Sequence, residues 1–221
     1  MERSVTELIE SVRRIPPVFK KFSSDIHQVD PLLRIASMYA LLSSKTIQDP
    51  LILDIGCGYG TGPILLHSMG YTPIGIESNK EKLEDGLTYW SRLGYSVAYV
   101  EDFPTVPDPS YVYFMNRHAG MLDDIASSSL QTVSSFYISS YMLSKKHGAF
   151  CDVKRILADD GVFYLSTSDP LPSAFPNFAQ DIAVHVLSKF LLPSGMKIQA
   201  FEKYDKEHIR DYYLFSLQKV T

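Results

Sequence analysis

The chain has 221 residues, of which 45% are hydrophobic, and its formal net charge is −4 at pH 7. This length and composition predict one domain with a substantial core, and the slightly acidic balance does not favour a polyanionic partner such as nucleic acid. The two cysteines, Cys57 and Cys151, are too few for a disulfide framework and lack metal-ligand spacing. Because no segment resembles a membrane span or a signal peptide, we predict a cytoplasmic protein.

Residues 1–48 are predicted to form short helices, which Pro16-Pro17 and Asp30-Pro31 separate. These helices either form a lid over the mouth of the fold that follows or cover its edge. The sequence leaves both possibilities open.

A nucleoside-binding βαβ unit is indicated by the stretch LILDIGCGYGTGPILLHSMGYTPIGIESN. Its first strand is Leu51–Ile55, and glycines follow at once at positions 56, 58 and 60. Thr61 is expected to cap the next helix. The amino end of that helix would then face whatever lies over the glycines.

Glu77 follows the second predicted strand, Pro73–Ile76, at the edge where open α/β sheets bind ligands. A carboxylate there can accept hydrogen bonds from two ribose hydroxyls, and charge-assisted bonds contribute about 1.5–3 kcal/mol each. The alternative is a solvent-exposed glutamate without a ligand. The glycine turn upstream favours the ribose role.

The third predicted strand, Val97–Val100, also ends at an acid, in the run Glu101-Asp102-Phe103. Asp102 can accept a hydrogen bond from an adenine amine while Phe103 packs on the ring face. The alternative is a turn or helix cap, because prolines follow at positions 104 and 107.

The other predicted elements continue the alternation of strands and helices. They are a helix from Asn79 or Ser78 to about Leu93 with Leu83, Leu87 and Trp90 on one face, a strand Tyr111–Met115, a helical region from Leu122 to Lys146, a helix that stops at Asp160-Gly161, a strand Val162–Ser166, a loop Asp169–Pro176, a helix marked by Phe178 and Phe190, and terminal strands Lys197–Glu202 and Tyr212–Lys219. This alternation predicts an α/β fold with a doubly wound, mostly parallel sheet.

One adenosine-bearing ligand can contact the glycines, Glu77 and Asp102, which follow three successive strands. A dinucleotide motif G-x-G-x-x-G fails in both registers, because Thr61 or Pro63 stands where the third glycine is needed. The phosphate-binding motif G-x-x-x-x-G-K-[ST] is also missing from the sequence.

The motifs LDIGCGYGTG, GIESN and YVEDF resemble the first three motifs of class I S-adenosylmethionine-dependent methyltransferases, and VYFMNRH and DVKRILADDGVFYLS continue the resemblance. It covers roughly residues 51–167. It implies a Rossmann-like core in residues 49–221, which forms a single domain with the cap in residues 1–48. It also implies a seven-stranded sheet of order 3-2-1-4-5-7-6, whose last strand runs antiparallel inside the sheet.

The resemblance implies a role for each matching residue. Asp54 and the glycine turn approach the methionine moiety, Glu77 binds the ribose, Asp102 and Phe103 bind adenine, and Met115 and Asn116 line the sulfonium side. The expected contacts of S-adenosylmethionine are Asp54, Gly56, Cys57, Gly58, Tyr59, Gly60, Glu77, Ser78, Asp102, Phe103, Met115 and Asn116. Tyr59 can equally be a lid contact.

A general base is needed only if the methyl acceptor carries a proton at the moment of attack. His118, just beyond the fourth predicted strand, is the best-placed candidate, although a polar loop residue is the favoured interpretation. No metal site is predicted.

The leading hypothesis is a methyltransferase acting on a small molecule in preference to a protein side chain. Nucleic acid is not expected, because Asp108-Pro109-Ser110-Tyr111 precedes the fourth strand, whereas the similar D-P-P-Y motif of adenine methyltransferases follows it. The alternatives are an inactive cofactor-binding module that acts through a partner, and a nucleoside enzyme of other chemistry, such as aminopropyl transfer. The sequence specifies neither the acceptor nor the oligomeric state.

Overall fold

A computed structural model describes residues 49–136, 149–167, 195–204 and 212–220 of the chain. Several predicted elements lie outside these residues, namely the N-terminal helices, the helical region beyond residue 136, the proline-rich loop and the helix marked by Phe178 and Phe190. No helix within the described ranges is long and apolar enough to cross a membrane.

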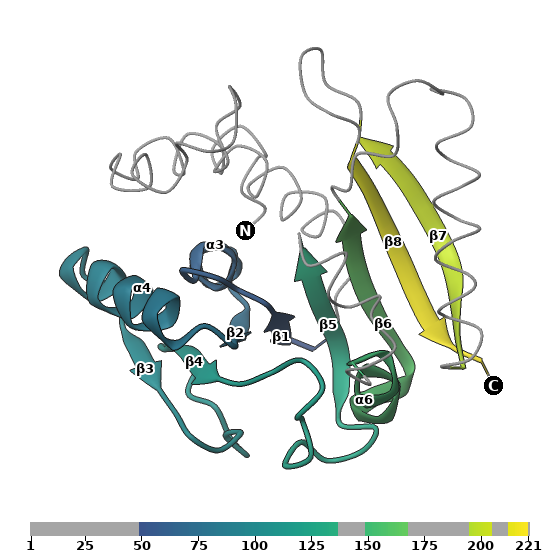
Figure 1. The fold of residues 1–221 in the computed structure, drawn as a ribbon, viewed down its shortest axis with the longest axis horizontal. Helices are drawn as coiled ribbons and strands as arrows, with labels where there is room; N and C mark the ends of the chain where they lie inside the picture. The colour runs from purple at the N-terminus through teal and green to yellow at the C-terminus, as the bar shows by residue number, and fades with distance from the viewer. Residues whose placement is uncertain (1–48, 137–148, 168–194, 205–211, 221) are drawn as a thin grey trace.

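The described part of the chain forms one eight-stranded sheet with three helices (Figure 1). The elements are β1 Leu51–Ile55, α3 Thr61–Ser68, β2 Thr72–Glu77, α4 Lys80–Arg92, β3 Val97–Tyr99, β4 Val112–Asn116, β5 Leu130–Phe136, α6 Ala149–Ile156, β6 Leu157–Thr167, β7 Met196–Tyr204 and β8 Tyr212–Lys219. The strands lie in the order β3-β4-β2-β1-β5-β6-β8-β7.

The sheet is mostly parallel, as predicted. The strands β3, β4, β2, β1, β5 and β6 all pair in parallel with their neighbours. The last strand, β8, is antiparallel to both β6 and β7 and lies between them. The structure therefore confirms the predicted α/β class and the antiparallel last strand inside the sheet.

The sheet differs from the prediction in one extra strand. When the three-residue edge strand β3 is set aside, the other seven strands, counted along the chain, follow the order 3-2-1-4-5-7-6. The numbering agrees only in this count, and the predicted strand order is wrong in detail, because two of its places belong to other segments. The third place belongs to β4 rather than Val97–Val100, and the fourth to β5 rather than Tyr111–Met115.

Strand β5 corrects the prediction of a helix over the same residues. Leu130, Val133 and Phe136 recur every three residues, which imitates one face of a helix. In the structure the strand pairs with β1 and β6, and its residues from Thr132 to Ser135 are all buried. A central strand buried on both faces lacks the alternating pattern that marks a half-exposed strand.

Helices cover both faces of the sheet, as expected of a doubly wound fold. Val112 and Phe114 of β4 pack on one face with Ile64 of α3 and with Leu83 and Trp90 of α4. The neighbouring residue in β4, Met115, points to the opposite face and joins the larger core.

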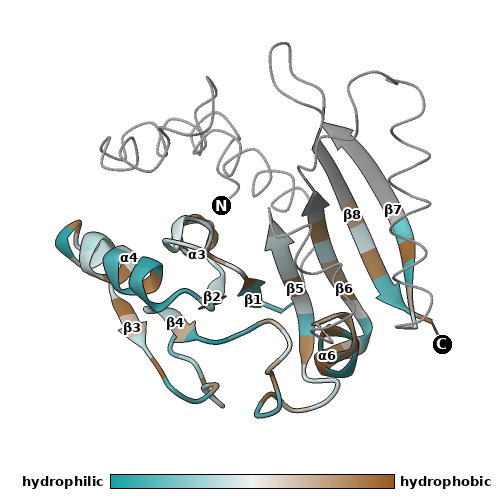
Figure 2. Cartoon of the chain, in the orientation of Figure 1, coloured by the Kyte–Doolittle hydropathy of each residue, from teal (hydrophilic) through white to brown (hydrophobic). Residues whose placement is uncertain are grey.

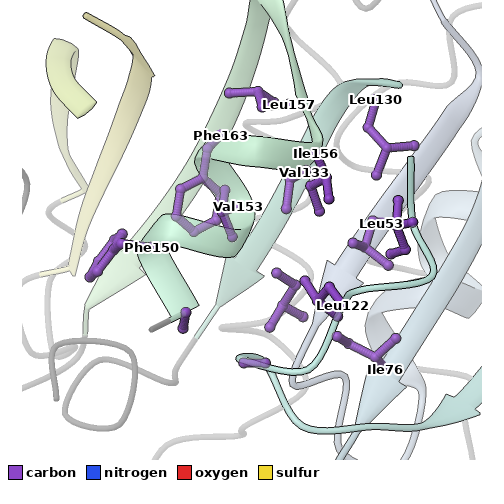
Figure 3. Close-up of a cluster of buried hydrophobic side chains, with 14 of the residues drawn as sticks. Leu53, Ile76, Leu122, Leu130, Val133, Phe150, Val153, Ile156, Leu157 and Phe163 are labelled. Atoms are coloured by element: carbon purple, nitrogen blue, oxygen red, sulfur yellow. The ribbon is translucent and has the colours of Figure 1, made fainter. Parts of the chain in front are cut away.

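The larger core gathers side chains from the central strands, from α6 and from the segment between β4 and β5 (Figure 3). Leu53, Leu122, Val133, Val153 and Phe163 are each no more than 1% exposed in it. Each such side chain contributes about 1.5–3 kcal/mol by its removal from water. This core holds the carboxyl ends of β1, β2, β4 and β5 in fixed relative positions.

Helix α4 has the predicted apolar face. Leu83 and Trp90 are buried and Leu87 is half-buried, while Figure 2 shows most of the remaining α4 ribbon as hydrophilic. Asn79 caps the helix by accepting a hydrogen bond from the Lys82 amide at 3.1 Å, which confirms one of the two predicted caps.

Helix α3 starts differently from the prediction. Its N-cap is Gly60 rather than Thr61, and no side chain makes a capping hydrogen bond. The backbone of Gly60 lies in the left-handed region, at φ 83°, which the tight turn from the loop into the helix requires and which glycine adopts without steric cost.

Candidate functional site

The glycine loop, residues 56–60, joins β1 to α3 at the carboxyl edge of the sheet. The backbone amides of Gly56 and Cys57 donate to the carbonyl of Ile76 at 2.7 and 3.0 Å, so the loop starts against the end of β2. At the other end of the loop, a Cβ atom on Gly60 would lie 2.5 Å from the Phe114 ring. Only glycine fits there without displacing the core.

Glu77 lies directly beside this loop, as the sequence predicted. Its Oε2 atom accepts from the Gly58 amide at 3.0 Å, and its Oε1 atom accepts from the Asn79 amide at 2.8 Å and the Ser78 hydroxyl at 3.4 Å. A carboxylate offers about four acceptor positions, so acceptor capacity is left on this half-buried group. The backbone therefore orients Glu77 without exhausting it.

Asp54 is buried beneath the loop, with 1% of its surface exposed. Its Oδ1 atom accepts from the hydroxyl of Ser134, a fully buried residue of β5, at 2.7 Å. The sequence reasoning missed Ser134 because it placed this segment in a helix. The register of β1 with β5 brings the two residues side by side.

The two polar side chains within the loop are held neutral by their surroundings. Burial raises the pKa of the Cys57 thiol well above its ordinary value, and the negative charges of Asp54 and Glu77 raise it further. Burial, followed by the charge of Asp85, also raises the pKa of the Tyr59 phenol. The charges near the loop are therefore those of the carboxylates around it, and Cys57 is not an activated nucleophile.

Asn116 and Met115 lie on the other side of β2 from the position the prediction gave them. The Asn116 side-chain amide donates to the carbonyls of Glu77 and Ser78 at 2.8 and 3.2 Å, and Met115 is 1% exposed in the core. The expected sulfonium contacts assumed that their strand neighbours β1, whereas β4 neighbours β2. In the structure Asn116 fastens the end of β4 to the end of β2.

Asp102 and Phe103 follow β3, one strand further from Glu77 than predicted. The Asp102 side chain is 95% exposed, whereas Phe103 packs against the larger core and its amide donates to Asp124 at 3.1 Å. Arg117 joins the loop between β3 and β4 to the loop between β4 and β5, because its guanidinium donates to the Glu101 carbonyl at 2.6 Å and pairs with Asp124. The adenine-binding role of Asp102 and Phe103 stays a prediction.

His118 is half-buried in the loop after β4. Its Nδ1 atom accepts a hydrogen bond from the Gly120 amide at 3.3 Å, so this ring nitrogen is engaged with the backbone of its own loop. That arrangement favours the loop role over the role of general base. Among the described residues, no three His, Cys, Asp or Glu side chains are placed to hold a metal ion.

Trp90 was predicted only as a core residue, but it also contacts the loop. Its indole Nε1 donates to the Tyr59 carbonyl at 2.7 Å. Periodicity identifies such a residue as buried and gives no signal for the polar contact of its ring nitrogen.

Comparison with known proteins gives structural likeness without sequence likeness. No protein-family model matches the sequence, and a search of curated proteins finds no match. A methyltransferase from Methanosarcina mazei, described as SAM-dependent, aligns with a TM-score of 0.60 at 18% identity over 82% of this chain and 98% of its own.

Two further solved structures carry more specific descriptions. A geranyl diphosphate methyltransferase in complex with SAM aligns with a TM-score of 0.58 at 14% identity, over 85% of this chain and 86% of its own. A ribosomal protein L11 methylase from Lactobacillus delbrueckii subsp. bulgaricus aligns with a TM-score of 0.56 at 12% identity, over 85% and 79%. The chain has the class I, Rossmann-like fold of the SAM-dependent methyltransferases.

Proposed function

We propose that this protein is an S-adenosylmethionine-dependent methyltransferase whose acceptor is a small molecule in preference to a protein side chain. The observation that carries the proposal is the Glu77 carboxylate, which the amides of Gly58 and Asn79 hold at the carboxyl ends of β1 and β2. In open α/β sheets this edge is where ligands bind.

The residues around Glu77 fit an adenosyl-sulfonium cofactor. A backbone donor orients each Glu77 oxygen, and Oε2, which accepts only from the Gly58 amide among the described residues, keeps capacity for a ribose hydroxyl. The space in front of Gly58 is open among the described residues, since a Cβ atom built there would have none of their atoms within 4 Å. The buried Asp54 and the half-buried Glu77 supply negative charge, which suits a ligand with sulfonium and ammonium groups.

When bound, S-adenosylmethionine supplies a methyl group already activated for displacement. The task of the chain is then to align the cofactor with the acceptor and to exclude water. The alignment is the role of the glycine loop, of Glu77 and of Asp54, which the neighbouring Ser134 hydroxyl orients. We assign no general base, because the His118 Nδ1 atom is engaged with the backbone.

The fold does not select the acceptor. The similar structures are described as acting on geranyl diphosphate in one case and on ribosomal protein L11 in another, so their common fold is compatible with different acceptors. The net charge of −4 supports a small molecule over nucleic acid. Two free cysteines, Cys57 and Cys151, support a reducing compartment such as the cytoplasm.

Calorimetric titration of the whole protein with S-adenosylmethionine tests the proposal. We expect binding, and we expect Glu77→Gln to weaken it by about tenfold to a hundredfold, because one or two charge-assisted hydrogen bonds are lost. The matched control is Glu81→Gln, which removes the same charge from an exposed position at the start of α4. Absence of binding by the wild-type protein would refute the proposal.

Turnover separates an enzyme from an inactive binding module. S-adenosylhomocysteine should accumulate when the protein is incubated with S-adenosylmethionine and a library of metabolites. Tight binding without accumulation across metabolites and protein extracts would favour the module.

A further inference from the structure

The glycine loop rests on helix α4 at Tyr59. The indole Nε1 of Trp90, which is fully buried, donates to the carbonyl of Tyr59 at 2.7 Å. This carbonyl belongs to the backbone of the loop itself. The hydrogen bond therefore fixes the course of the chain, not only the position of a side chain.

Gly86 brings the helix close enough for this contact. A Cβ atom at this position would lie 2.3 Å from the Tyr59 carbonyl oxygen and 2.8 Å from its carbon. Glycine inside a helix is unfavourable relative to alanine. The direct approach of α4 to the backbone of the loop is the physical reason for it here.

The indole is also held in orientation by two tyrosine rings. Tyr89 and Tyr95 meet it edge to face, with ring centroids 5.1 and 5.6 Å away and interplanar angles of 75° and 89°. A buried indole N–H needs an acceptor in any protein, so the hydrogen bond alone is compatible with a purely structural role. The contact at the start of α4 supports a role beyond structure.

Helix α4 is connected to the glycine loop in two ways, once through Glu77 and once directly. At its start, the amide of the N-cap residue Asn79 donates to Glu77 at 2.8 Å, and Glu77 in turn accepts from the Gly58 amide at 3.0 Å. Further along the same helix, Trp90 holds the Tyr59 carbonyl. The loop and the acid beside it are thus positioned by one rigid element.

We propose that Trp90 is a positioning residue for the ligand site, and that its indole senses occupation of the glycine loop. The inference rests on the proposed function. Without the indole N–H, the Tyr59 carbonyl loses this donor, the loop samples other positions and the Gly58 amide leaves Glu77 for part of the time. Affinity then falls in proportion to the fraction of molecules whose loop is in place.

The test compares Trp90→Phe with Tyr95→Phe by calorimetric titration with S-adenosylmethionine. Trp90→Phe keeps a buried aromatic ring and removes the N–H donor, whereas Tyr95→Phe alters the same aromatic cluster and leaves the donor in place. We expect about tenfold weaker binding for Trp90→Phe, which corresponds to the net loss of one hydrogen bond, and wild-type affinity for Tyr95→Phe. Circular dichroism checks that each variant is folded.

A second variant approaches the same contact from the helix. Gly86→Ala should keep or raise the helical signal, yet weaken binding by about tenfold, because its methyl group displaces the Tyr59 carbonyl. Thr88→Ala is the control, since it changes an exposed position of the same helix. This variant keeps the proposal testable if Trp90→Phe fails to fold.

The wild-type protein provides a readout that a merely structural tryptophan would not give. Trp90 is the single tryptophan of the chain, so all indole emission comes from it. We expect its emission to change during titration with S-adenosylmethionine and to follow the calorimetric saturation curve. This inference alone would be overturned if Trp90→Phe and Gly86→Ala both bound within twofold of wild type. It would also be overturned if the Trp90 emission did not change as the protein became saturated. A wild-type protein that binds no S-adenosylmethionine would overturn the proposed function and this inference with it.

Discussion

Two acids of this chain, Glu77 and Asp102, lie at or just beyond the carboxyl end of a short strand, but their surroundings in the structure differ. Glu77 is the last residue of β2, which lies between β1 and β4, and three donors from the adjoining backbone and from Ser78 contact its oxygens. Asp102 follows β3 at the edge of the sheet, and its side chain is 95% exposed. The same local pattern thus has two outcomes.

The difference lies in what surrounds each strand end. An interior strand has neighbours on both sides whose loops converge on its carboxyl end, so an acid there meets backbone donors. An edge strand has one neighbour, and the partner of the Asp102 carboxylate within the described part of the chain is the Arg117 guanidinium, with 3.9 Å between Nη2 and Oδ1. Position in the sheet, more than the residue type, decides whether a strand-end acid is oriented.

The largest change in stability is expected for the glycine loop beside Glu77, on the interior side of this comparison. Gly60→Ala should lower the free energy of unfolding by about 3 kcal/mol, because the new methyl group meets the buried Phe114 ring and the backbone sits at φ 83°. Urea denaturation measures the loss. Gly70→Ala is the control, since φ there is 93° but a Cβ atom has no neighbour within 4 Å in the described ranges, so about 1 kcal/mol is expected. Equal losses would show that the loop is not packed as described.

The sequence predicted the parts of the site that local signals encode. The glycine loop, Glu77 and the Asn79 cap depend on residues close together in the chain, and the structure places them as expected. The last strand, Tyr212–Lys219, also has the predicted bounds.

Sequence patterns failed where strand neighbours depend on distant segments. The residues of Leu130–Phe136 carry no local signal that this strand will lie between β1 and β6. Those of Val97–Tyr99 likewise carry no signal that β4 will lie between this strand and β2. The contact of Ser134 with Asp54 followed from the first of these pairings, so it was missed with it. The solvent exposure of Asp102 followed from the second.

Two adjacent serines of β5, Ser134 and Ser135, differ in their hydrogen bonds. Replacing each by alanine should therefore change the free energy of unfolding in opposite directions. Ser134→Ala should cost about 2 kcal/mol of stability, because Asp54 loses a donor in a buried place. Ser135→Ala should stabilise the protein by about 1 kcal/mol, because the Ser135 hydroxyl is fully buried and has no hydrogen-bond partner within the described ranges. Chemical denaturation of both variants decides the point, and effects of the same sign would contradict the described contacts.

At the edge of the sheet, Asp102 is contacted by the Arg117 guanidinium where Glu77 is contacted by backbone amides. A smaller change in stability is expected here. Arg117→Lys should lower the free energy of unfolding by about 1 kcal/mol, since an ammonium cannot reach both the Glu101 carbonyl and Asp124 as the guanidinium does. Arg92→Lys, at the exposed end of α4, should change stability by less than about 0.5 kcal/mol. Thermal unfolding of the pair gives the comparison, and equal values would mean that the two loops are not held by Arg117.

The smallest effect is expected for Asp102 itself, and it tests the contrast directly. Asp102→Asn should change the affinity for S-adenosylmethionine by less than about twofold, whereas Glu77→Gln should weaken it by about tenfold or more, although each removes one charge. The reason is that an exposed carboxylate is solvated by water and gains little from a ligand amine, while Glu77 is already oriented by the Gly58 and Asn79 amides. A tenfold loss for Asp102→Asn would instead support the adenine contact, and would mean that ligand binding draws this edge loop over the ring.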